Sequence, residues 1–264
     1  MILLLGGTSE SLAVADYLRM HNALFTVSVV SDYGAKLAQQ HSKKVNQIIF
    51  SEENFSAFCR NNKIDFIVDA THPFARIISK LAIDEAQKLN IPYLRFERQN
   101  EYSKNTMLKM VDSLADACRY LQNTDGKIYL STGSKTAPQY ADELGVKRLH
   151  VRVLPTLKVM ENLTNAGFIA SQIDAIQGPF TTAMNIELFK HADAQIVVTK
   201  ESGRQGRIQE KIAACEQLGI PCVIIRRPQI KYPHVVADLK ELGKYLEENY
   251  ERQSNASRGR AGKF

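Results

Sequence analysis

Apolar and polar positions alternate along the chain in an order that predicts strands and helices in turn. Residues 1–5 form a continuous apolar run that ends in glycines, which is typical of a strand buried on both faces. Leu12, Ala15 and Leu18 then recur at a spacing of three, as on the buried face of a helix. Further strands are expected at residues 25–30, 66–70 and 93–96, and a helix at residues 75–89. This order predicts an α/β fold with a parallel sheet.

The second half of the chain shows the same alternation and aligns with the first half. Strands are predicted at residues 127–130, 149–153, 195–199 and 222–225, and an amphipathic helix at residues 238–250. The pattern Leu-X-Ile-Pro occurs at residues 89–92 and again 129 positions later, at residues 218–221. Such internal similarity indicates a repeated unit, although a proline that stops a helix before a strand could also recur by chance. We therefore expect an α/β fold of two Rossmann-like parallel-sheet domains with an inter-domain cleft.

The repeat and the charge distribution define the expected organisation of the chain. An N-terminal cofactor-binding domain is predicted at residues 1–125, a substrate domain at residues 126–250, and a basic disordered tail at residues 251–264. The formal net charge is +6. Three arginines and one lysine in the tail after Glu251 supply four of these charges. The remaining charge of about +2 (6 − 4) is too small for a surface that follows nucleic-acid phosphates, so no nucleic-acid partner is predicted.

Other features of the sequence concern membranes, metals and location. The apolar runs are far shorter than the ~20 residues of a membrane span, and Gly6 and Gly7 interrupt the first run before it resembles a signal peptide. A cytoplasmic protein without a membrane partner is therefore expected, as a monomer or a small homo-oligomer. The cysteines at positions 59, 118, 215 and 222 lack metal-ligand spacing, so we predict buried thiols and no metal site.

The first candidate site is the turn that follows the strand at residues 1–5. Small residues let a backbone approach a pyrophosphate, and the N–H groups that open the next helix favour an anion. The match to G-x-G-x-x-G is partial, because Thr8 and Ser11 replace two glycines. A tight turn capped by Ser9 is the structural alternative. The candidate cofactor ligands in this turn are Gly6, Gly7, Thr8, Ser9 and Glu10.

The second candidate site follows the predicted strand at residues 25–30, where the adenosine ribose of a dinucleotide would lie. Ser31 and Asp32 are the candidate residues. An acid about 20 residues beyond the glycines binds a ribose hydroxyl and favours NADH, whereas Ser31 or Lys36 could instead meet the 2′-phosphate of NADPH. A capped turn would explain the segment without any cofactor.

The third candidate site follows the predicted strand at residues 66–70. Ligands of open α/β sheets bind beyond the carboxyl ends of the strands, so Ala70, Thr71 and His72 are expected beside the nicotinamide. His72 could donate a proton or a hydrogen bond there. A histidine beside a helix start is alternatively a structural cap.

Loops with small and cationic residues follow the predicted strands of the second half. Lys and Arg beside glycines suit carboxylates or phosphates, although a solvated surface loop is the alternative. Lys200 is also a candidate proton donor. The candidate substrate ligands are Ser131, Thr132, Gly133, Lys135, Gln177, Lys200, Ser202, Gly203 and Arg204. Since the sequence has no G-x-S-x-G elbow and no P-loop lysine motif, a bound cofactor would have to supply the chemistry.

In this order the loops resemble the precorrin-6A reductase family of cobalamin biosynthesis, including its cobalt-precorrin-6A branch. The resemblance extends from residue 1 to about residue 246, and Gln99 departs from it, because proline is expected there. The matching segments are residues 6–10, 69–75, 95–98, 131–133, 153–155, 177–180, 199–203 and 226–228.

The resemblance implies a reductase with two Rossmann-like domains. It implies hydride transfer from NADPH, or NADH, to one ring double bond of precorrin-6A or cobalt-precorrin-6A, with a proton added to the neighbouring carbon. The substrate would be a polycarboxylate tetrapyrrole, whose arms could meet the cations at the strand ends. These cations are Lys135, Arg152, Lys200, Arg204, Arg226 and Arg227. The alternatives are a generic NAD(P)H reductase of another acidic substrate, a non-catalytic nucleotide-sensing Rossmann protein and a small-molecule transferase.

Overall fold

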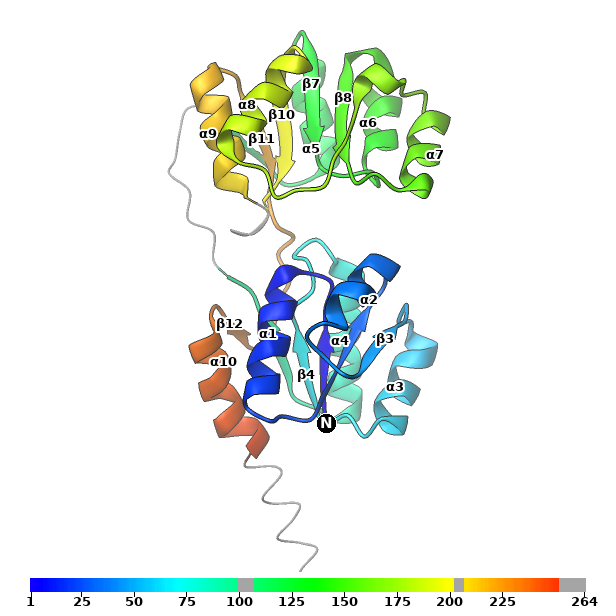
Figure 1. Ribbon diagram of the computed structural model, residues 1–264, viewed down its shortest axis with the longest axis vertical. Helices are drawn as coiled ribbons and strands as arrows, with labels where there is room; N and C mark the ends of the chain where they lie inside the picture. The colour runs from blue at the N-terminus through cyan, green and yellow to red at the C-terminus, as the bar shows by residue number, and fades with distance from the viewer. Residues whose placement is uncertain (99–106, 202–206, 252–264) are drawn as a thin grey trace, which may run out of the picture. The chain divides into compact units, whose positions relative to one another are not determined.

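The chain folds into two α/β units, each built on its own parallel sheet (Figure 1). The structure is a computed structural model that describes residues 1–98, 107–201 and 207–251. The described residues of the first unit lie within Met1–Gln99 and Pro228–Phe264, and those of the second within Asn100–Arg227. Within these described residues no helix is long and apolar enough to cross a membrane.

The first unit has the strand order of a dinucleotide-binding sheet. Its six strands are parallel and follow the order β12-β5-β4-β1-β2-β3, which is the Rossmann order 3-2-1-4-5-6 read from the other edge. The order reverses between β1 and β4, so ligands are expected beyond the carboxyl ends of these two strands. The elements are β1 (Ile2–Leu5), α1 (Ser9–Met20), β2 (Phe25–Val29), α2 (Asp32–Ala38), β3 (Val45–Gln47), α3 (Glu52–Asn61), β4 (Phe66–Asp69), α4 (Arg76–Leu89), β5 (Tyr93–Phe96), β12 (Val235–Val236), α10 (Leu239–Leu246) and a π-helical turn (Glu247–Glu251).

The second unit repeats this order with a second set of strands. The order is β6-β11-β10-β7-β8-β9, again all parallel, so β7 to β11 correspond in sequence order to β1 to β5. This confirms the prediction of two Rossmann-like sheets. The elements are β6 (Leu108–Val111), α5 (Leu114–Gln122), β7 (Lys127–Ser131), α6 (Ala137–Leu144), η1 (Val146–Arg148), β8 (Leu149–Val153), α7 (Leu157–Asn165), η2 (Ala170–Gln172), β9 (Ile173–Ala175), α8 (Thr182–His191), β10 (Ala194–Lys200), α9 (Ile208–Leu218) and β11 (Cys222–Ile225).

The observed boundary differs from the division expected at residue 125, because the second unit begins before that residue and the first unit regains the chain after residue 227. β6 and α5 precede residue 125, yet β6 pairs with β11 of the second sheet. β12 and α10 come after the second unit, yet β12 pairs with β5 of the first sheet. Residues 1–98 therefore lack one strand of their own sheet, which the chain supplies only when it returns at residue 235.

The apolar runs form the cores as their pattern predicts. All four residues of β1 are buried, and alternate residues face opposite sides of the sheet. One face packs against α1, α2 and α10, and the other packs against α3 and α4. In the second unit, α8 and α9 supply the apolar residues that cover one face of the sheet. The four cysteines are buried free thiols, as expected.

Candidate functional site

The turn after β1 is open at the position where a pyrophosphate would approach. Gly7 has a φ of +108°, and a Cβ built on it would meet no atom within 4 Å. Gly6 is more confined, because its Cβ would lie 3.1 Å from both Ser11 Oγ and Val27 Cγ1. Gly7 therefore combines a backbone conformation that disfavours side chains with free space on its outer side.

Hydrogen bonds hold this turn in place and join it to the strand across the switch point. Thr8, rather than Ser9, is the N-cap of α1, because its Oγ1 accepts from Ser11 N at 3.0 Å. The same hydroxyl donates to Ala70 O at 2.8 Å, which links the ends of β1 and β4. The first helical residues, Ser9 and Glu10, have no intrahelical acceptor for their amides. These amides are the donors that a helix start presents to an anion.

A buried polar network lies beneath the segment at residues 70–72. Asp69, which ends β4, is fully buried, and its Oδ1 accepts from Arg95 Nη1 at 2.8 Å and from Thr71 N at 2.9 Å. Its Oδ2 accepts from Ser79 Oγ at 2.6 Å and from Tyr93 Oη at 2.5 Å. The carboxylate thus joins β4, β5 and α4 at one point below the loop.

The charge on Asp69 is maintained by its partners. Burial alone would raise the pKa of this carboxyl. The positive charge of Arg95 and the hydrogen bonds from Ser79, Thr71 and Tyr93 outweigh burial and lower the pKa below its usual value. Arg95 also pairs with Glu97 at 2.8 Å, and its guanidinium carbon lies 5.1 Å from the centre of the Tyr232 ring. Sequence reasoning missed this network, although it placed Asp69 and Arg95 in two of the matching segments.

Thr71 and His72, expected beside the nicotinamide, both have hydrogen-bond partners within the protein. Thr71 is buried and donates its hydroxyl to Asp69 Oδ1 at 2.6 Å, so this hydroxyl stabilises the turn. His72 is exposed, and its Nδ1 accepts from Phe74 N at 3.2 Å. That hydrogen bond matches the capping alternative for His72, while the imidazole remains on the surface after β4.

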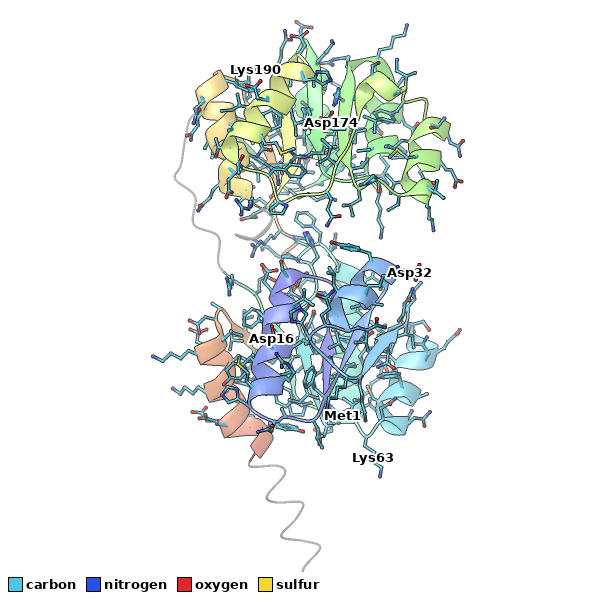
Figure 2. The ribbon with its side chains drawn as sticks, in the orientation of Figure 1. Met1, Asp16, Asp32, Lys63, Asp174 and Lys190 are labelled. Carbon is cyan, nitrogen blue, oxygen red and sulfur yellow. The ribbon has the colours of Figure 1, made fainter. Side chains whose placement is uncertain are left out.

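The expected adenosine segment lies at the same edge of the first sheet. Ser31 is the N-cap of α2 and accepts from Gly34 N at 3.0 Å, and Asp32 accepts from Gln47 Nε2 at 2.7 Å. Figure 2 shows Asp32 at one end of the first unit and Met1 and Lys63 at the other. Both acceptors therefore already have partners within the protein.

Exposed apolar side chains surround this segment and were missed by the sequence reasoning. Val30 follows β2, Tyr33 lies in the first turn of α2, and Ile49 follows β3. Their exposed fractions are 64%, 49% and 72%. Because β2 and β3 are neighbouring parallel strands, these three side chains lie at the same edge of the first sheet. Their position just after a strand end is the signal that could have found them.

In the second unit, the structure brings two predicted cations together at the carboxyl edge of the sheet. Burial lowers the pKa of Lys200, and the nearby positive charge of Lys135 lowers it further. Between them, after β7, Gly133 has a φ of +88° and open space at its Cβ position. Thr132 is buried and accepts from Thr136 Oγ1 at 3.0 Å. Gln177 is exposed after β9, whereas Ser202, Gly203 and Arg204 lie outside the described residues.

Three of the arginines expected to meet carboxylates have partners within the protein. Arg152 is buried, donates to Asn185 Oδ1 and Ser131 Oγ at 2.8 Å each, and lies 4.0 Å from the centre of the Phe180 ring. The remaining two also donate hydrogen bonds within the protein. Arg226 donates to Asp112 Oδ1 at 2.7 Å, and Arg227 donates to Glu201 O at 3.1 Å.

A buried lysine near Arg152 was also missed. Lys211 lies on the apolar face of α9 and is 8% exposed. Burial lowers its pKa to about 8, and the charge of Arg152 acts in the same direction. A lysine between Ile208 and Ile212 on an amphipathic helix is a pattern that could have revealed it.

The strand order and the open glycine turn define the class of protein, a Rossmann-type α/β protein with two such sheets. The chain belongs to the family described as Precorrin-6x reductase CbiJ/CobK, whose model matches residues 1–247. Its relatives are reductases of cobalamin biosynthesis, which are oxidoreductases that act on a carbon–carbon double bond of the ring.

Similarities to individual reductases agree with this family assignment. The chain is 36% identical to a cobalt-precorrin-6A reductase of Priestia megaterium, over 92% of this chain and 96% of that one. It is 31% identical to a precorrin-6A reductase of Rhodococcus erythropolis, over 87% and 90%. A solved structure named CobK precorrin-6A reductase matches with a TM-score of 0.75 at 21% identity, over 94% of this chain and 96% of that one. At that identity the structural match supports the fold alone.

Proposed function

We propose that this protein uses NADPH to reduce one ring double bond of precorrin-6A or its cobalt form. The observation that carries the proposal is the open turn at Gly7, linked through Thr8 to Ala70 at the point where the strand order reverses. Membership of the reductase family supports the substrate class. The product would gain one hydride at a ring carbon and one proton at its neighbour.

The residues of the first unit fit a dinucleotide. The turn at Gly6 and Gly7 and the amides of Ser9 and Glu10 would hold the pyrophosphate, because they offer open backbone and unpaired helix-start donors. When bound, the nicotinamide supplies the hydride. Beside it, the backbone at residues 70–72 would orient the ring, and the Asp69 network would keep that backbone in position.

Contacts around the adenosine would combine apolar and polar groups. Val30, Tyr33 and Ile49 offer the apolar surface on which an adenine ring could stack. Ser31 and Asp32 lie beside it and would face the ribose. Asp32 accepts from Gln47 through Oδ1 alone, so its carboxylate could still bind a ribose hydroxyl, whereas Lys36 in the same helix could meet the 2′-phosphate of NADPH.

Residues of the second unit would bind the tetrapyrrole. Lys135 and Lys200 lie close enough to lower the pKa of Lys200, and a carboxylate arm between two ammonium groups would relieve their repulsion. The surrounding loop residues would complete this contact. They are Ser131, Thr132, Gly133 and Gln177, together with Ser202, Gly203 and Arg204 outside the described part of the chain.

Two side chains are assigned to proton delivery, His72 from the first unit and Lys200 from the second. Burial and the charge of Lys135 lower the pKa of Lys200, which makes its ammonium a stronger acid than that of an ordinary lysine. His72 is exposed after β4, and an imidazolium can donate a proton. Replacing each in turn and following the alkaline limb of kcat against pH would identify the donor, because a proton donor loses activity as it deprotonates.

The experiment that tests the proposal is anaerobic mixing of the protein, NADPH and either tetrapyrrole, with nicotinamide absorbance as the readout. We expect stoichiometric NADPH oxidation with precorrin-6A or cobalt-precorrin-6A, and slower oxidation with NADH. Binding of NADPH without oxidation would instead indicate a nucleotide sensor. Oxidation with other acidic acceptors but not with the tetrapyrroles would indicate a generic reductase.

Replacing Lys200 by methionine should weaken tetrapyrrole binding and leave cofactor binding intact. Loss of one charge-assisted hydrogen bond costs about 1.5–3 kcal/mol, so KM for the tetrapyrrole should rise roughly 10- to 100-fold. The Kd of NADPH, measured by fluorescence, should not change, because Lys200 belongs to the second unit. Lys190→Met is the matched control, since Lys190 is exposed and pairs with Glu187. An unchanged KM in Lys200→Met would contradict the assigned role.

A further inference from the structure

A second candidate binding site lies at the amino edge of the second sheet, away from the loops described above. A cavity of about 320 Å³ opens there among the starts of strands and the ends of helices. Lys127 begins β7, Leu149 begins β8, the η2 turn precedes β9, and His191 ends α8. The loops with Gly133 and Lys200 follow the other ends of β7 and β10, so this cavity is separate from the proposed substrate contacts.

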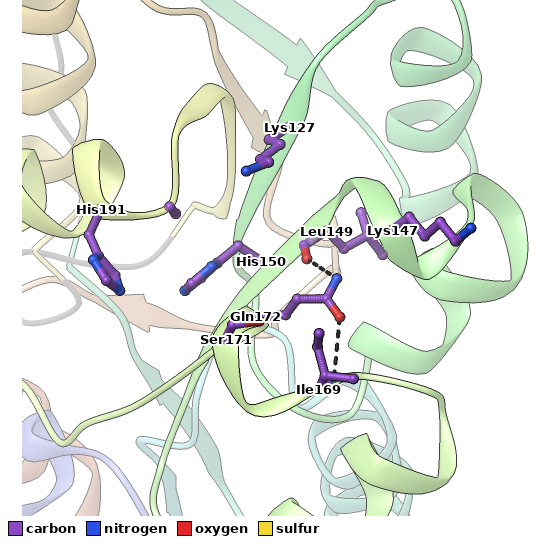
Figure 3. Close-up of a pocket in the computed structure, with 9 residues that line it drawn as sticks. Lys127, Lys147, Leu149, His150, Ile169, Ser171, Gln172 and His191 are labelled. Atoms are coloured by element: carbon purple, nitrogen blue, oxygen red, sulfur yellow. Dashed lines mark hydrogen bonds between the residues drawn. The ribbon is translucent and has the colours of Figure 1, made fainter.

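The lining of the cavity is basic and rich in hydrogen-bond donors. Figure 3 shows the rings of His150 and His191 extending toward one another, with the ammonium group of Lys127 directed to the same side. The ring centres of His150 and His191 lie 6.3 Å apart. Lys147 lines the cavity with its stem, and its ammonium points away from the histidines (Figure 3). Among the described residues that line this cavity there is no carboxylate.

His150 is the buried anchor of this lining. Its side chain is only 7% exposed and stacks on Tyr129 at 5.4 Å between ring centres. Its Nε2 lies 3.1 Å from Asp174 Oδ1 but is not aligned with any hydrogen-bond acceptor in the described part of the structure. Because Nε2 faces the carboxylate, Nδ1 is the ring nitrogen that can serve a molecule in the cavity.

Two carboxylates, Asp174 and Asp193, lie near the cavity but do not line it. Burial would raise the pKa of Asp174, but contacts with His150 and Tyr129 and the positive charges of His150 and His191 lower it. Asp174 accepts from Tyr129 Oη at 2.5 Å and lies behind His150. Asp193 lies 3.7 Å from Lys127, but both side chains are more than half exposed, so this pair is weak and readily exchanged.

We propose that this cavity binds a small phosphate-bearing anion through Lys127, His150, His191 and the hydroxyl of Ser171. These four donors come from four separate elements and converge on one cavity. Phosphate is the oxyanion that matches them, because it offers three or four acceptor oxygens, whereas a single carboxylate offers two. The apolar side chains of Leu149, Ile169 and Ala192 complete the wall. The ligand is either inorganic phosphate or a phosphate monoester.

The test is a titration of the full chain with sodium phosphate at constant pH and ionic strength, observed through histidine imidazole NMR signals. The His191 signal is identified by its loss in His191→Gln, an exposed position. We expect a saturable shift of this signal with phosphate and none with chloride at equal ionic strength. Titration with ribose 5-phosphate distinguishes the sources, because tighter binding than inorganic phosphate would identify a monoester.

Two variants complete the test. Lys127→Met should weaken phosphate binding at least roughly tenfold, since it removes one charged donor. Lys190→Met should leave binding unchanged, because Lys190 does not line the cavity and pairs with Glu187 at 3.1 Å. It is a close control, since it is next to His191 in the sequence. A shift that does not saturate, or equal affinities in the two variants, would overturn the proposal. Phosphate bound by the first unit would not move the His191 signal, so the cofactor proposal is tested separately.

Discussion

Replacing Gly7 by valine is expected to abolish NADPH binding while the protein remains folded. A side chain at this position would occupy the open space through which a pyrophosphate reaches the backbone. The left-handed backbone at a φ of +108° adds strain of about 1–2 kcal/mol. Titration of intrinsic or nucleotide fluorescence should show a loss of roughly 100-fold or more in affinity, which equals about 2.8 kcal/mol.

The control for Gly7→Val is Gly219→Val, which imposes similar backbone strain elsewhere. Gly219 is the C-cap of α9, has a φ of +66°, and also has open space at its Cβ position. Both variants should lose comparable thermal stability, but only Gly7→Val should lose NADPH affinity. Normal affinity in Gly7→Val would mean that the turn after β1 does not hold the cofactor.

Sequence reasoning found all the inner strands of both sheets and missed all four edge strands. The inner strands β1, β2, β4 and β5, and their counterparts in the second unit, are apolar runs buried by neighbours on both sides. The edge strands β3, β6, β9 and β12 are two to four residues long and partly exposed. A strand with one neighbour needs fewer apolar residues, so its sequence resembles that of a loop.

The missed edge strands also explain the incorrect domain boundary. The internal repeat locates the four inner strands of each sheet, but β6 and β12 lie across the expected boundary at residue 125 from the strands with which they pair. Pairing of β12 with β5 joins residues about 140 positions apart, such as Val235 and Arg95 (235 − 95 = 140). Local patterns contain no information about such a distant pairing.

The backbone shape of the candidate site was predictable from the sequence, whereas the pairing of its side chains was not. The glycine turn was found because glycines after a buried strand indicate a tight approach. Thr71 was expected to face the nicotinamide, but its hydroxyl bonds to Asp69. The ion pair of Asp69 and Arg95 joins two neighbouring strands, and no periodic pattern relates residues 26 positions apart.

This ion pair leads to the second large effect, a strong loss of stability when Asp69 is replaced by alanine. Removing one partner of a buried pair typically costs about 3–5 kcal/mol, because the other charge stays buried without compensation. Arg95 would retain Glu97, but the hydroxyls of Ser79 and Tyr93 and the amide of Thr71 would also lose their shared acceptor. Urea denaturation should measure this change in the free energy of unfolding.

Asp16→Ala is the matched control, since Asp16 also pairs with a cation but at the surface. Its partners are Arg19 at 3.0 Å and His41 at 2.8 Å. Exposed pairs contribute about 0–1 kcal/mol, so this variant should remain close to the wild type. If Asp69→Ala were as mild as Asp16→Ala, the network beneath residues 70–72 would have no structural role.

Asp69→Asn keeps the size of the side chain but removes its charge. Comparing the free energy of unfolding of this variant and the wild type at different pH values therefore measures the contribution of the charge. The pKa of Asp69 is lower in the folded protein than its unfolded value of about 3.9. The charged form therefore stabilises the folded state fully above that unfolded pKa, and this contribution disappears as the pH falls through the lower, folded pKa. The stability difference between wild type and Asp69→Asn should thus be constant near neutral pH and shrink below about pH 4. A difference that stayed constant down to the lowest pH at which both proteins fold would show that the carboxylate charge does not hold Arg95, and that the remaining hydrogen bonds alone position the segment after β4.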